Sequence, residues 1–246
     1  MSDGDFDDLA ANYEQFRTGY SSDLFDSLGE LGFRNGMRVL DVACGSGISM
    51  DPLVARGMNL VGIDSSTEML KAAKRRVPAA TLAHGRAEAL PFENAFFDGA
   101  ISAQSFHWFD QPAVLREMIR VVRSGGPVAV WWKVLTASDK MRTFRAAACK
   151  EVGLPVADKI LKGGFRAFYG APFARRALRV LPHIVRVSVD DWIGYERSRA
   201  QARNNYGTRR DAYIDALRRQ LLEAAGTSGA SIDVRYMQYL YVGYVA

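Results

Sequence analysis

Short apolar segments alternate with segments of helical periodicity between residues 37 and 135, and this alternation limits the possible folds most strongly. The apolar segments are bounded by turn residues and are predicted strands over 37–42, 59–63, 81–83, 98–103 and 127–132. Helices are predicted between them, over 46–56, over 65–76 and from 110 onward. Strands that alternate with helices through short loops indicate a parallel sheet covered by helices.

Local signals mark where these helices begin. Ser65 and Glu68 have the spacing of a capping box, and Asp110 is a predicted N-cap with Pro112 in the first turn of its helix. Pro52 lies inside the helix predicted over 46–56, where its missing N–H is tolerated only near the start.

The pattern changes after residue 139. Helices are predicted over 139–152, from about Asp190, and over 208–225, the last with Thr208 and Asp211 as a cap. Alternating residues predict strands over 184–189 and 232–244, the latter as an antiparallel partner in the sheet. Residues 153–182 mix glycine, proline, arginine and aromatic residues without a clear period.

Charge divides the chain at the same place. The 246 residues carry a formal net charge of +5, but residues 1–139 hold 13 Lys/Arg against 18 Asp/Glu, a net −5. Residues 140–246 hold 19 against 9, a net +10. An acidic first part and a basic second part suggest that the two parts contact different chemical groups.

We expect that this chain does not belong to several classes of protein. Cys44 and Cys149 are too few for a disulfide framework, which indicates a reducing compartment. The N-terminus is acidic, and no apolar run approaches the roughly 20 residues that span a bilayer. His84, His107 and His183 lack metal-ligand spacing. A cytoplasmic protein without a metal site is expected.

A glycine-rich loop follows the first predicted strand, in the sequence VLDVACGSG of residues 39–47. Small residues there let the backbone approach a ligand at the carboxyl edge of the sheet. Asp64 comes 19 residues after Gly45, where a carboxylate can bind both hydroxyls of a ribose. A dinucleotide fingerprint requires a third glycine, and Met50 stands in its place. The loop alone leaves open an adenosine cofactor or a tight turn with a capping aspartate.

Longer motifs resemble those of class I S-adenosylmethionine-dependent methyltransferases. The D-x-A-x-G-x-G run from Asp41 resembles their motif I, with Ala43 at the first glycine, and VGIDSSTEML resembles motif II. The segments HGRAEALPFENAFFDGAISAQSFHWF and SGGPVAVWW resemble the adenine-side loop with the fourth strand and the turn into the fifth. The match covers about residues 37–132. The sequences FHWF and YEQFRTGY further resemble the type 11 branch that contains trans-aconitate methyltransferase-like proteins.

The resemblance implies a fold, an activity and a cofactor. We expect an α/β, Rossmann-like, seven-stranded and mostly parallel sheet with helices on both faces and an antiparallel last strand. Residues 1–246 would form one domain, with a cofactor-binding core over 37–135 and a helical substrate lid over 139–182. The expected activity is methyl transfer from S-adenosylmethionine to a small acceptor.

The resemblance also implies roles for individual residues. Relatives often carry an aspartate where this chain has Arg86, so contact with the adenine amino group is expected from the backbone of Ala87. The residues expected to bind the cofactor are Arg17, Asp41, Ala43, Cys44, Gly45, Asp64, Ser65, Met69, Arg86, Ala87, Glu88, Ser102, Ala103 and Gln104. Those expected to bind the acceptor are Tyr13, His107, Trp108, Trp132, Arg166 and Tyr169.

Some of these residues have alternative roles. His107 is the candidate catalytic base, but His107 and Trp108 can instead form a polar and an aromatic wall of the pocket. Methyl transfer from a sulfonium depends chiefly on alignment, so a base can be absent. Arg17 can pair with the cofactor carboxylate or be a solvated helix charge. Cys44 and Cys149 are interpreted as packing residues.

The basic second part leaves three interpretations open. Arginines and aromatics there can line a pocket for a small anionic or polar acceptor, form a nucleic-acid surface, or be ordinary solvated faces. We favour the small acceptor, with methylation at oxygen. An RNA-modifying methyltransferase and a non-catalytic S-adenosylmethionine-binding protein are the alternatives, and a homodimer is a possible assembly.

Overall fold

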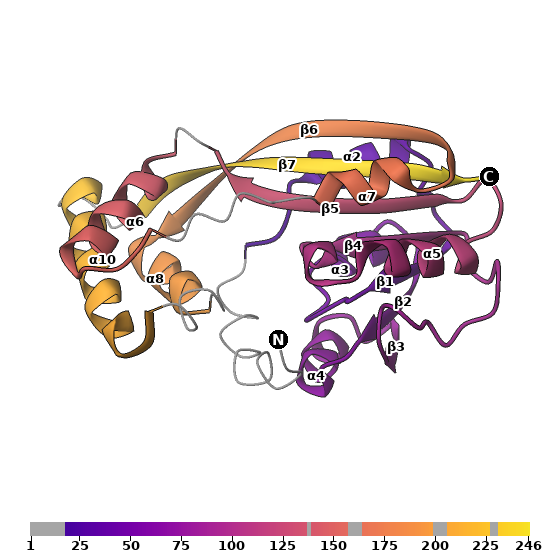
Figure 1. Ribbon diagram of the computed structural model, residues 1–246, viewed down its shortest axis with the longest axis horizontal. Helices are drawn as coiled ribbons and strands as arrows, with labels where there is room; N and C mark the ends of the chain where they lie inside the picture. Colours follow the sequence, from indigo (N-terminus) through magenta and orange to yellow (C-terminus); the bar gives the residue numbers. More distant parts are fainter. Residues whose placement is uncertain (1–17, 137–138, 157–163, 199–205, 227–230) are drawn as a thin grey trace.

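Seven strands form one sheet in the order β3-β2-β1-β4-β5-β7-β6 (Figure 1). The computed structural model describes residues 18–136, 139–156, 164–198, 206–226 and 231–246. The strands are β1 (Arg38–Val42), β2 (Asn59–Asp64), β3 (Thr81–His84), β4 (Gly99–Ala103), β5 (Pro127–Leu135), β6 (Phe173–Ser188) and β7 (Ser231–Val245).

The strand directions confirm the mostly parallel sheet. Strands β1 to β5 pair in parallel, β7 is antiparallel to β5, and β6 is antiparallel to β7. Strand β1 lies between β2 and β4, so the strand order reverses there and the loops after these strands diverge. Such a switch point is where an open α/β sheet binds its ligands.

Helices cover both faces of this sheet, as predicted. Helices α5 (Gln111–Val121) and α7 (Gly164–Gly170) pack on one face, where Met118 and Phe168 join the core with Leu40 and Val130. Helices α2 (Ser22–Glu30), α3 (Asp51–Val54) and α4 (Thr67–Arg76) lie on the other face. Central strands that are buried on both faces read as continuous apolar runs, which explains their clear sequence signal.

Three further helices form a separate core beyond the end of β5. Helices α6 (Lys140–Glu151), α8 (Val189–Arg197) and α10 (Arg210–Ala225), here called the helical unit, pack around Trp192, Tyr213 and Leu217 (Figure 1). Arg145 and the fully buried Glu196 form an ion pair inside it, and the Tyr213 hydroxyl donates to Glu196 at 3.3 Å. Cys149 is also buried there, which confirms its packing role.

The start predicted for the helix over 46–56 is wrong. Only Asp51–Val54 are α-helical, because Gly45 and Gly47 adopt positive φ angles of 55° and 78° that no right-handed helix contains. The helix therefore begins after the loop, and Pro52 falls in its first turn, where no intrahelical N–H is required.

Two predicted caps are also wrong. The N-cap of α4 is Ser66, whose hydroxyl accepts from Met69 N at 3.2 Å, and Ser65 instead lies in the loop before it. The Asp64 carboxylate accepts from Ser66 N at 2.9 Å, which fixes the chain so that Ser66 reaches the helix. Helix α10 has Arg209 as its N-cap without a side-chain bond, after the 3-10 turn Gly207–Arg209.

Strand β6 begins at Phe173, well before the strand predicted over 184–189. The expected lid segment 139–182 therefore contains α6, α7 and the first part of a sheet strand. Arg175, Arg176 and Arg179 belong to this edge strand. The sequence of this first half does not alternate between apolar and polar residues, because its side chains are mostly exposed on both faces and include these arginines.

Within the described residues, no helix is long and apolar enough to cross a membrane.

The turn into β5 predicts a steric limit at Gly126. A Cβ there would lie 2.5 Å from Val122 Cγ1 and 2.6 Å from Asp98 O. Gly126→Ala should therefore lower the free energy of unfolding by about 1 to 3 kcal/mol, the usual cost of overpacking. The control Gly29→Ala adds the same methyl group to α2, with nothing within 4 Å, and should raise stability by roughly 0.5 to 1 kcal/mol. Urea unfolding measures both values. Equal shifts for the two variants would contradict the prediction.

Candidate functional site

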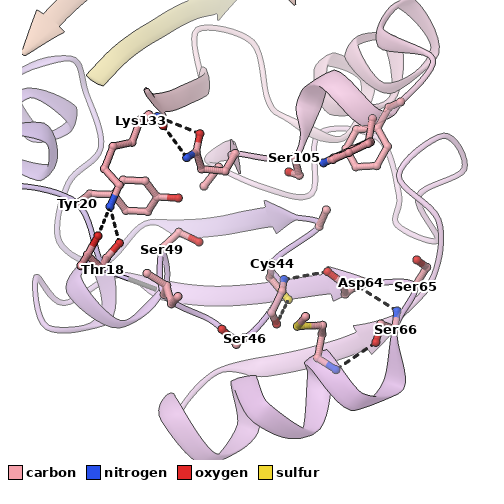
Figure 2. Close-up of a pocket in the computed structure, with 18 of the residues that line it drawn as sticks. Thr18, Tyr20, Cys44, Ser46, Ser49, Asp64, Ser65, Ser66, Ser105 and Lys133 are labelled. Carbon is pink, nitrogen blue, oxygen red and sulfur yellow. Dashed lines mark hydrogen bonds between the residues drawn. The ribbon is translucent and has the colours of Figure 1, made fainter. Parts of the chain in front are cut away.

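A pocket opens at the carboxyl ends of β1, β2, β4 and β5 (Figure 2). It has a volume of about 1040 Å³ including its open mouth. Its lining comes from the loops after these strands, from the segment before α2 and from α8. The lining residues are Thr18, Tyr20, Ala43, Cys44, Gly45, Ser46, Ile48, Ser49, Asp64, Ser65, Ser66, Met69, Ala103, Gln104, Ser105, Trp108, Phe109, Lys133 and Tyr195.

The glycine-rich loop lines one side of the pocket in an unusual backbone conformation. Ala43, Gly45 and Gly47 have φ angles of 58°, 55° and 78°, all in the left-handed region. Ala43 occupies the position at which motif I usually has glycine, and a residue with a Cβ is strained there by roughly 1 to 2 kcal/mol. Cys44 N donates to Ile63 O at 3.1 Å, so the loop is held against β2.

Asp64 links this loop to the end of β2. Its Oδ2 accepts from Gly45 N at 2.8 Å, and its Oδ1 accepts from Ser66 N at 2.9 Å (Figure 2). Burial raises the pKa of this carboxyl, and the backbone hydrogen bonds from Ser66 and Gly45 oppose the rise. The carboxylate faces the pocket and has acceptor capacity beyond these backbone bonds, so it can accept from a hydroxyl of a ligand.

Asp41 lies at the end of β1 and does not line the pocket directly. It is fully buried, and its Oδ2 accepts from the Ser49 hydroxyl at 2.5 Å. Burial raises its pKa to about 7, while the Ser49 bond lowers the pKa and the nearby charge of Asp64 raises it further. Asp41 is therefore a group whose charge changes near neutral pH.

Cys44 lines the pocket with a protonated thiol. Burial raises its pKa well above the ordinary value, and the charges of Asp41 and Asp64 add to the rise. The Sγ atom lies 3.8 Å from Gly45 O. A nucleophilic cysteine requires the thiolate, so these surroundings support packing as the role of Cys44.

The loop after β4 forms the side of the pocket opposite β2. Ala103, Gln104 and Trp108 line it, and the Trp108 side chain is exposed at the mouth. Gln104 has a φ of 58°. Its side-chain Oε1 accepts from Lys133 N, and its Nε2 donates to Lys133 O, both at 2.9 Å. Ser102 lies beneath the surface, where its hydroxyl donates to Val42 O at 3.0 Å.

His107 and Trp132 lie beside the pocket and are not part of its lining. The Trp132 Nε1 donates to His107 Nδ1 at 3.1 Å, which leaves the proton of a neutral imidazole on Nε2. The His107 and Trp108 rings are 4.7 Å apart. These contacts suit His107 to holding the aromatic wall better than to removing a proton through Nδ1.

Other expected site residues lie outside the pocket lining. Ala87 is buried in the core, and the exposed Arg86 forms an ion pair with Glu88 at 3.7 Å. Arg166 and Tyr169 lie on α7, which leads into Phe173 beside the amino end of β5, at the opposite edge of the sheet (Figure 1). Tyr13 and Arg17 lie outside the described residues.

Sequence reasoning missed several lining residues. Lys133 is the first charged residue after the apolar segment of β5. The predicted strand ends at Trp132, whereas β5 continues to Leu135 and brings Lys133 into the pocket lining. Ser46, Ile48, Ser49 and Phe109 belong to loops already singled out. Thr18 and Tyr20 belong to the YEQFRTGY motif, which suggested a role in the site only for Tyr13 and Arg17. Tyr195 carries no local signal, because it reaches the pocket only through tertiary packing.

The pocket suits a cofactor that brings polar groups into it. Among the described residues, Asp41 Oδ1 and Ser46 Oγ are buried atoms without a hydrogen-bond partner. The open acceptor positions of Asp64 fit ribose hydroxyls, and the two buried acidic residues fit a positively charged ligand. No group of three or more potential metal ligands occurs in the part of the chain that is described. S-adenosylmethionine has the corresponding adenosyl, amino and sulfonium groups.

The strand order and the helices on both faces of the sheet match the Rossmann-like methyltransferase fold. Residues 40–130 match the family model described as a methyltransferase domain, and S-adenosylmethionine is the cofactor of this class. The matched residues include the loops after β1, β2 and β4, so this part of the chain resembles that family.

Individual relatives support the same class. An uncharacterized methyltransferase of Mycobacterium tuberculosis is 32% identical over 127 residues, which are 52% of this chain and 51% of the relative. Demethylmenaquinone methyltransferase of Renibacterium salmoninarum is 41% identical over 96 residues, which are 39% of this chain and 40% of the relative. The chain thus spans about half the length, or less, of these curated relatives.

A solved structure from Anaeromyxobacter dehalogenans, described as a candidate type II methyltransferase, resembles most of the chain. Its TM-score is 0.74 at 25% identity, and the alignment covers 94% of this chain and 98% of that chain.

The buried Asp41 predicts a specific dependence of stability on pH. Its folded pKa of about 7 exceeds the ordinary value of 3.8, so between these values the folded state binds more protons than the unfolded state. The contribution of Asp41 to the free energy of unfolding therefore falls as pH rises through this window. Asp41→Asn removes the titration and should gain stability relative to wild type between pH values of about 4 and 8.

The difference should reach a few kcal/mol, since one pKa unit corresponds to about 1.4 kcal/mol. Urea unfolding of both proteins at several pH values measures it. The exposed Asp26, for which Asp26→Asn is the control, should show no comparable trend. Parallel pH curves for wild type and Asp41→Asn would contradict the prediction.

Proposed function

We propose that the protein transfers a methyl group from S-adenosylmethionine to a small polar acceptor bound at the mouth of the pocket. The observation that carries this proposal is the position of Asp64, whose carboxylate joins the glycine-rich loop to the end of β2 and faces the pocket. The bound cofactor would supply a methyl group on its sulfonium for in-line transfer to the acceptor, and the C–S bond would break to leave S-adenosylhomocysteine. The chain has to hold, align and desolvate the two reactants.

Each side of the pocket has a separate task in this proposal. Asp64 would bind the ribose hydroxyls, and the backbone of residues 43–47 would lie along the cofactor. Asp41 would supply negative charge beneath the loop, toward the amino and sulfonium groups. Trp108, Phe109 and Tyr195 would form the aromatic walls that exclude water around the acceptor.

The lining supports a polar acceptor more than a strongly anionic one. The arginines that suggested an anion, Arg166 on α7 and those of β6, do not line the pocket. Lys133 is the one basic residue among the described lining residues, and its ammonium donates to backbone and hydroxyl oxygens of Thr18 and Gly19. Hydroxyl groups of Thr18, Ser105 and Tyr195 remain as polar features of that side.

We further propose oxygen as the methylated atom. An acceptor oxygen that is ionised, or that forms a hydrogen bond with the hydroxyls of the pocket, needs no strong base, which is consistent with the engaged Nδ1 of His107. The assignment to the trans-aconitate methyltransferase-like branch stays a prediction, since half of its evidence lies in residues 13–17, outside the described chain. The single-domain organisation, a cytoplasmic location and a homodimer also stay predictions.

Cofactor binding gives the first test. Asp64→Ala should weaken the binding of S-adenosylmethionine by at least about tenfold, because it removes a buried acceptor of two hydroxyls. Isothermal calorimetry measures the change, and Asp26→Ala removes an exposed carboxylate of α2 as the control. Thermal unfolding of each variant checks that the loop has kept its fold. Calorimetry that finds no binding to the wild-type protein would reject the proposal.

The acceptor class needs a second test. The protein, incubated with cofactor carrying a tritiated methyl group, should label a component of a small-molecule extract and leave total RNA unlabelled. Label in RNA would favour the RNA-modifying alternative. Label in neither, despite measured cofactor binding, would favour a non-catalytic binding protein.

A further inference from the structure

Residues 18–21, here called the N-terminal wall, close one side of the pocket just before α2. Thr18 and Tyr20 line the pocket. The Tyr20 ring packs edge-on against Trp131 at a centroid distance of 5.6 Å and against Phe25 at 6.2 Å. Tyr20 thus fixes one side of the wall to the apolar core, and the pocket side must be held by other contacts.

Lys133 holds that pocket side. Its Nζ donates to Thr18 O at 2.5 Å and to Thr18 Oγ1 at 2.7 Å (Figure 2). It also donates to Gly19 O at 2.7 Å. The same ammonium lies 5.6 Å from the Tyr20 ring centroid and 4.8 Å from that of Tyr236. Hydrogen bonds from a charged donor are about twice as strong as neutral ones, so this contact dominates the polar attachment of the wall.

Gln238 holds the other end of the wall. It lies opposite Lys133 in the register of β5 and β7 and is fully buried. Ser21 N donates to Gln238 Oε1 at 3.1 Å, and Gln238 Nε2 donates to Ser21 Oγ at 2.5 Å. Two neighbouring side chains on paired strands therefore attach both ends of the wall to the sheet.

The backbone of Lys133 is itself fixed by the opposite side of the pocket. The Gln104 side chain accepts from Lys133 N and donates to Lys133 O, so it extends the pairing of β4 and β5 beyond the strands. Gln104 N also donates to Trp131 O at 3.0 Å. The loop after β4 and the N-terminal wall thus share Lys133 as a common point of attachment.

We propose that Lys133 is a positioning residue, which holds the N-terminal wall across the pocket and thereby sets the affinity for the cofactor. This proposal rests on the proposed function. Without the ammonium, two carbonyls and a hydroxyl lose their donor, and the wall has to be ordered when the ligand binds. Lys133 acts through the wall and does not itself bind the cofactor carboxylate.

Lys133→Met tests this role, because methionine keeps an apolar stem and removes only the ammonium. Calorimetric titration with S-adenosylhomocysteine and with methylthioadenosine, which lacks the amino acid group, should show both ligands bound about tenfold more weakly. Amide hydrogen exchange of residues 18–24 should be faster in the ligand-free variant than in wild type. Lys133→Arg should restore most of the affinity and protection, and Thr18→Val, which removes one of three acceptors, should have a smaller effect.

Lys71→Met is the matched control, since Lys71 is an exposed residue of α4 that pairs with Glu68. It should leave affinity and exchange unchanged. Weaker binding of S-adenosylhomocysteine alone, with unchanged exchange, would overturn the proposal by showing direct contact with the carboxylate. Unchanged affinity and exchange in Lys133→Met would overturn it as well. If the wild-type protein binds neither ligand, the cofactor assignment is overturned. In that case, amide exchange of residues 18–24 in the ligand-free proteins still tests whether Lys133 holds the wall: faster exchange in Lys133→Met supports the attachment, and equal exchange overturns it.

Discussion

The hydrogen bond from Gly45 N to Asp64 Oδ2 joins the two loops on which the pocket depends. These loops follow the neighbouring parallel strands β1 and β2, beside the switch point between β1 and β4. Asp64 also accepts from Ser66 N, so one carboxylate sets both the glycine-rich loop and the start of α4. The left-handed backbone of Ala43, Gly45 and Gly47 brings the Gly45 N–H to this carboxylate. Local strain and one buried charge thus shape the cofactor side of the pocket together.

The buried Asp41 and the partly buried Asp64 carry an electrostatic cost at one end of the sheet. Burial raises the pKa of both Asp41 and Asp64, and the charge of Asp64 adds to the rise at Asp41. The bond from Ser49 offsets only part of this cost at Asp41. A cationic ligand near these groups would lower both pKa values and favour their charged forms. The positive sulfonium and amino groups of the cofactor therefore match a need that the fold itself creates.

The sequence allowed the cofactor side to be predicted, and the reason is physical. Strands β1, β2 and β4 are short and mostly buried, and the loops after β1 and β2 carry glycine and aspartate at positions that local geometry requires. Asp64 and the loop of Ala43 and Gly45 could be found this way.

The acceptor side of the pocket and the N-terminal wall could not be predicted in this way. Lys133 contacts Thr18 across 115 positions of sequence, and Tyr195 reaches the pocket from a helix of another core. Strand β6 was mostly missed because an edge strand with exposed arginines lacks the alternation of a half-buried one. The expected anionic acceptor stays a prediction, since Arg175, Arg176 and Arg179 lie on this edge strand and outside the pocket lining.

Strand β5 ends its pairing at Leu135, opposite Tyr236, whereas β6 and β7 continue as a two-stranded ribbon to Ser188 and Ser231. The helical unit is attached at the end of this ribbon, and it contributes Tyr195 to the pocket (Figure 1). A two-stranded ribbon twists more freely than a wide sheet. The wall that Tyr195 provides can therefore change its angle or its residues during evolution while the cofactor loops stay constant.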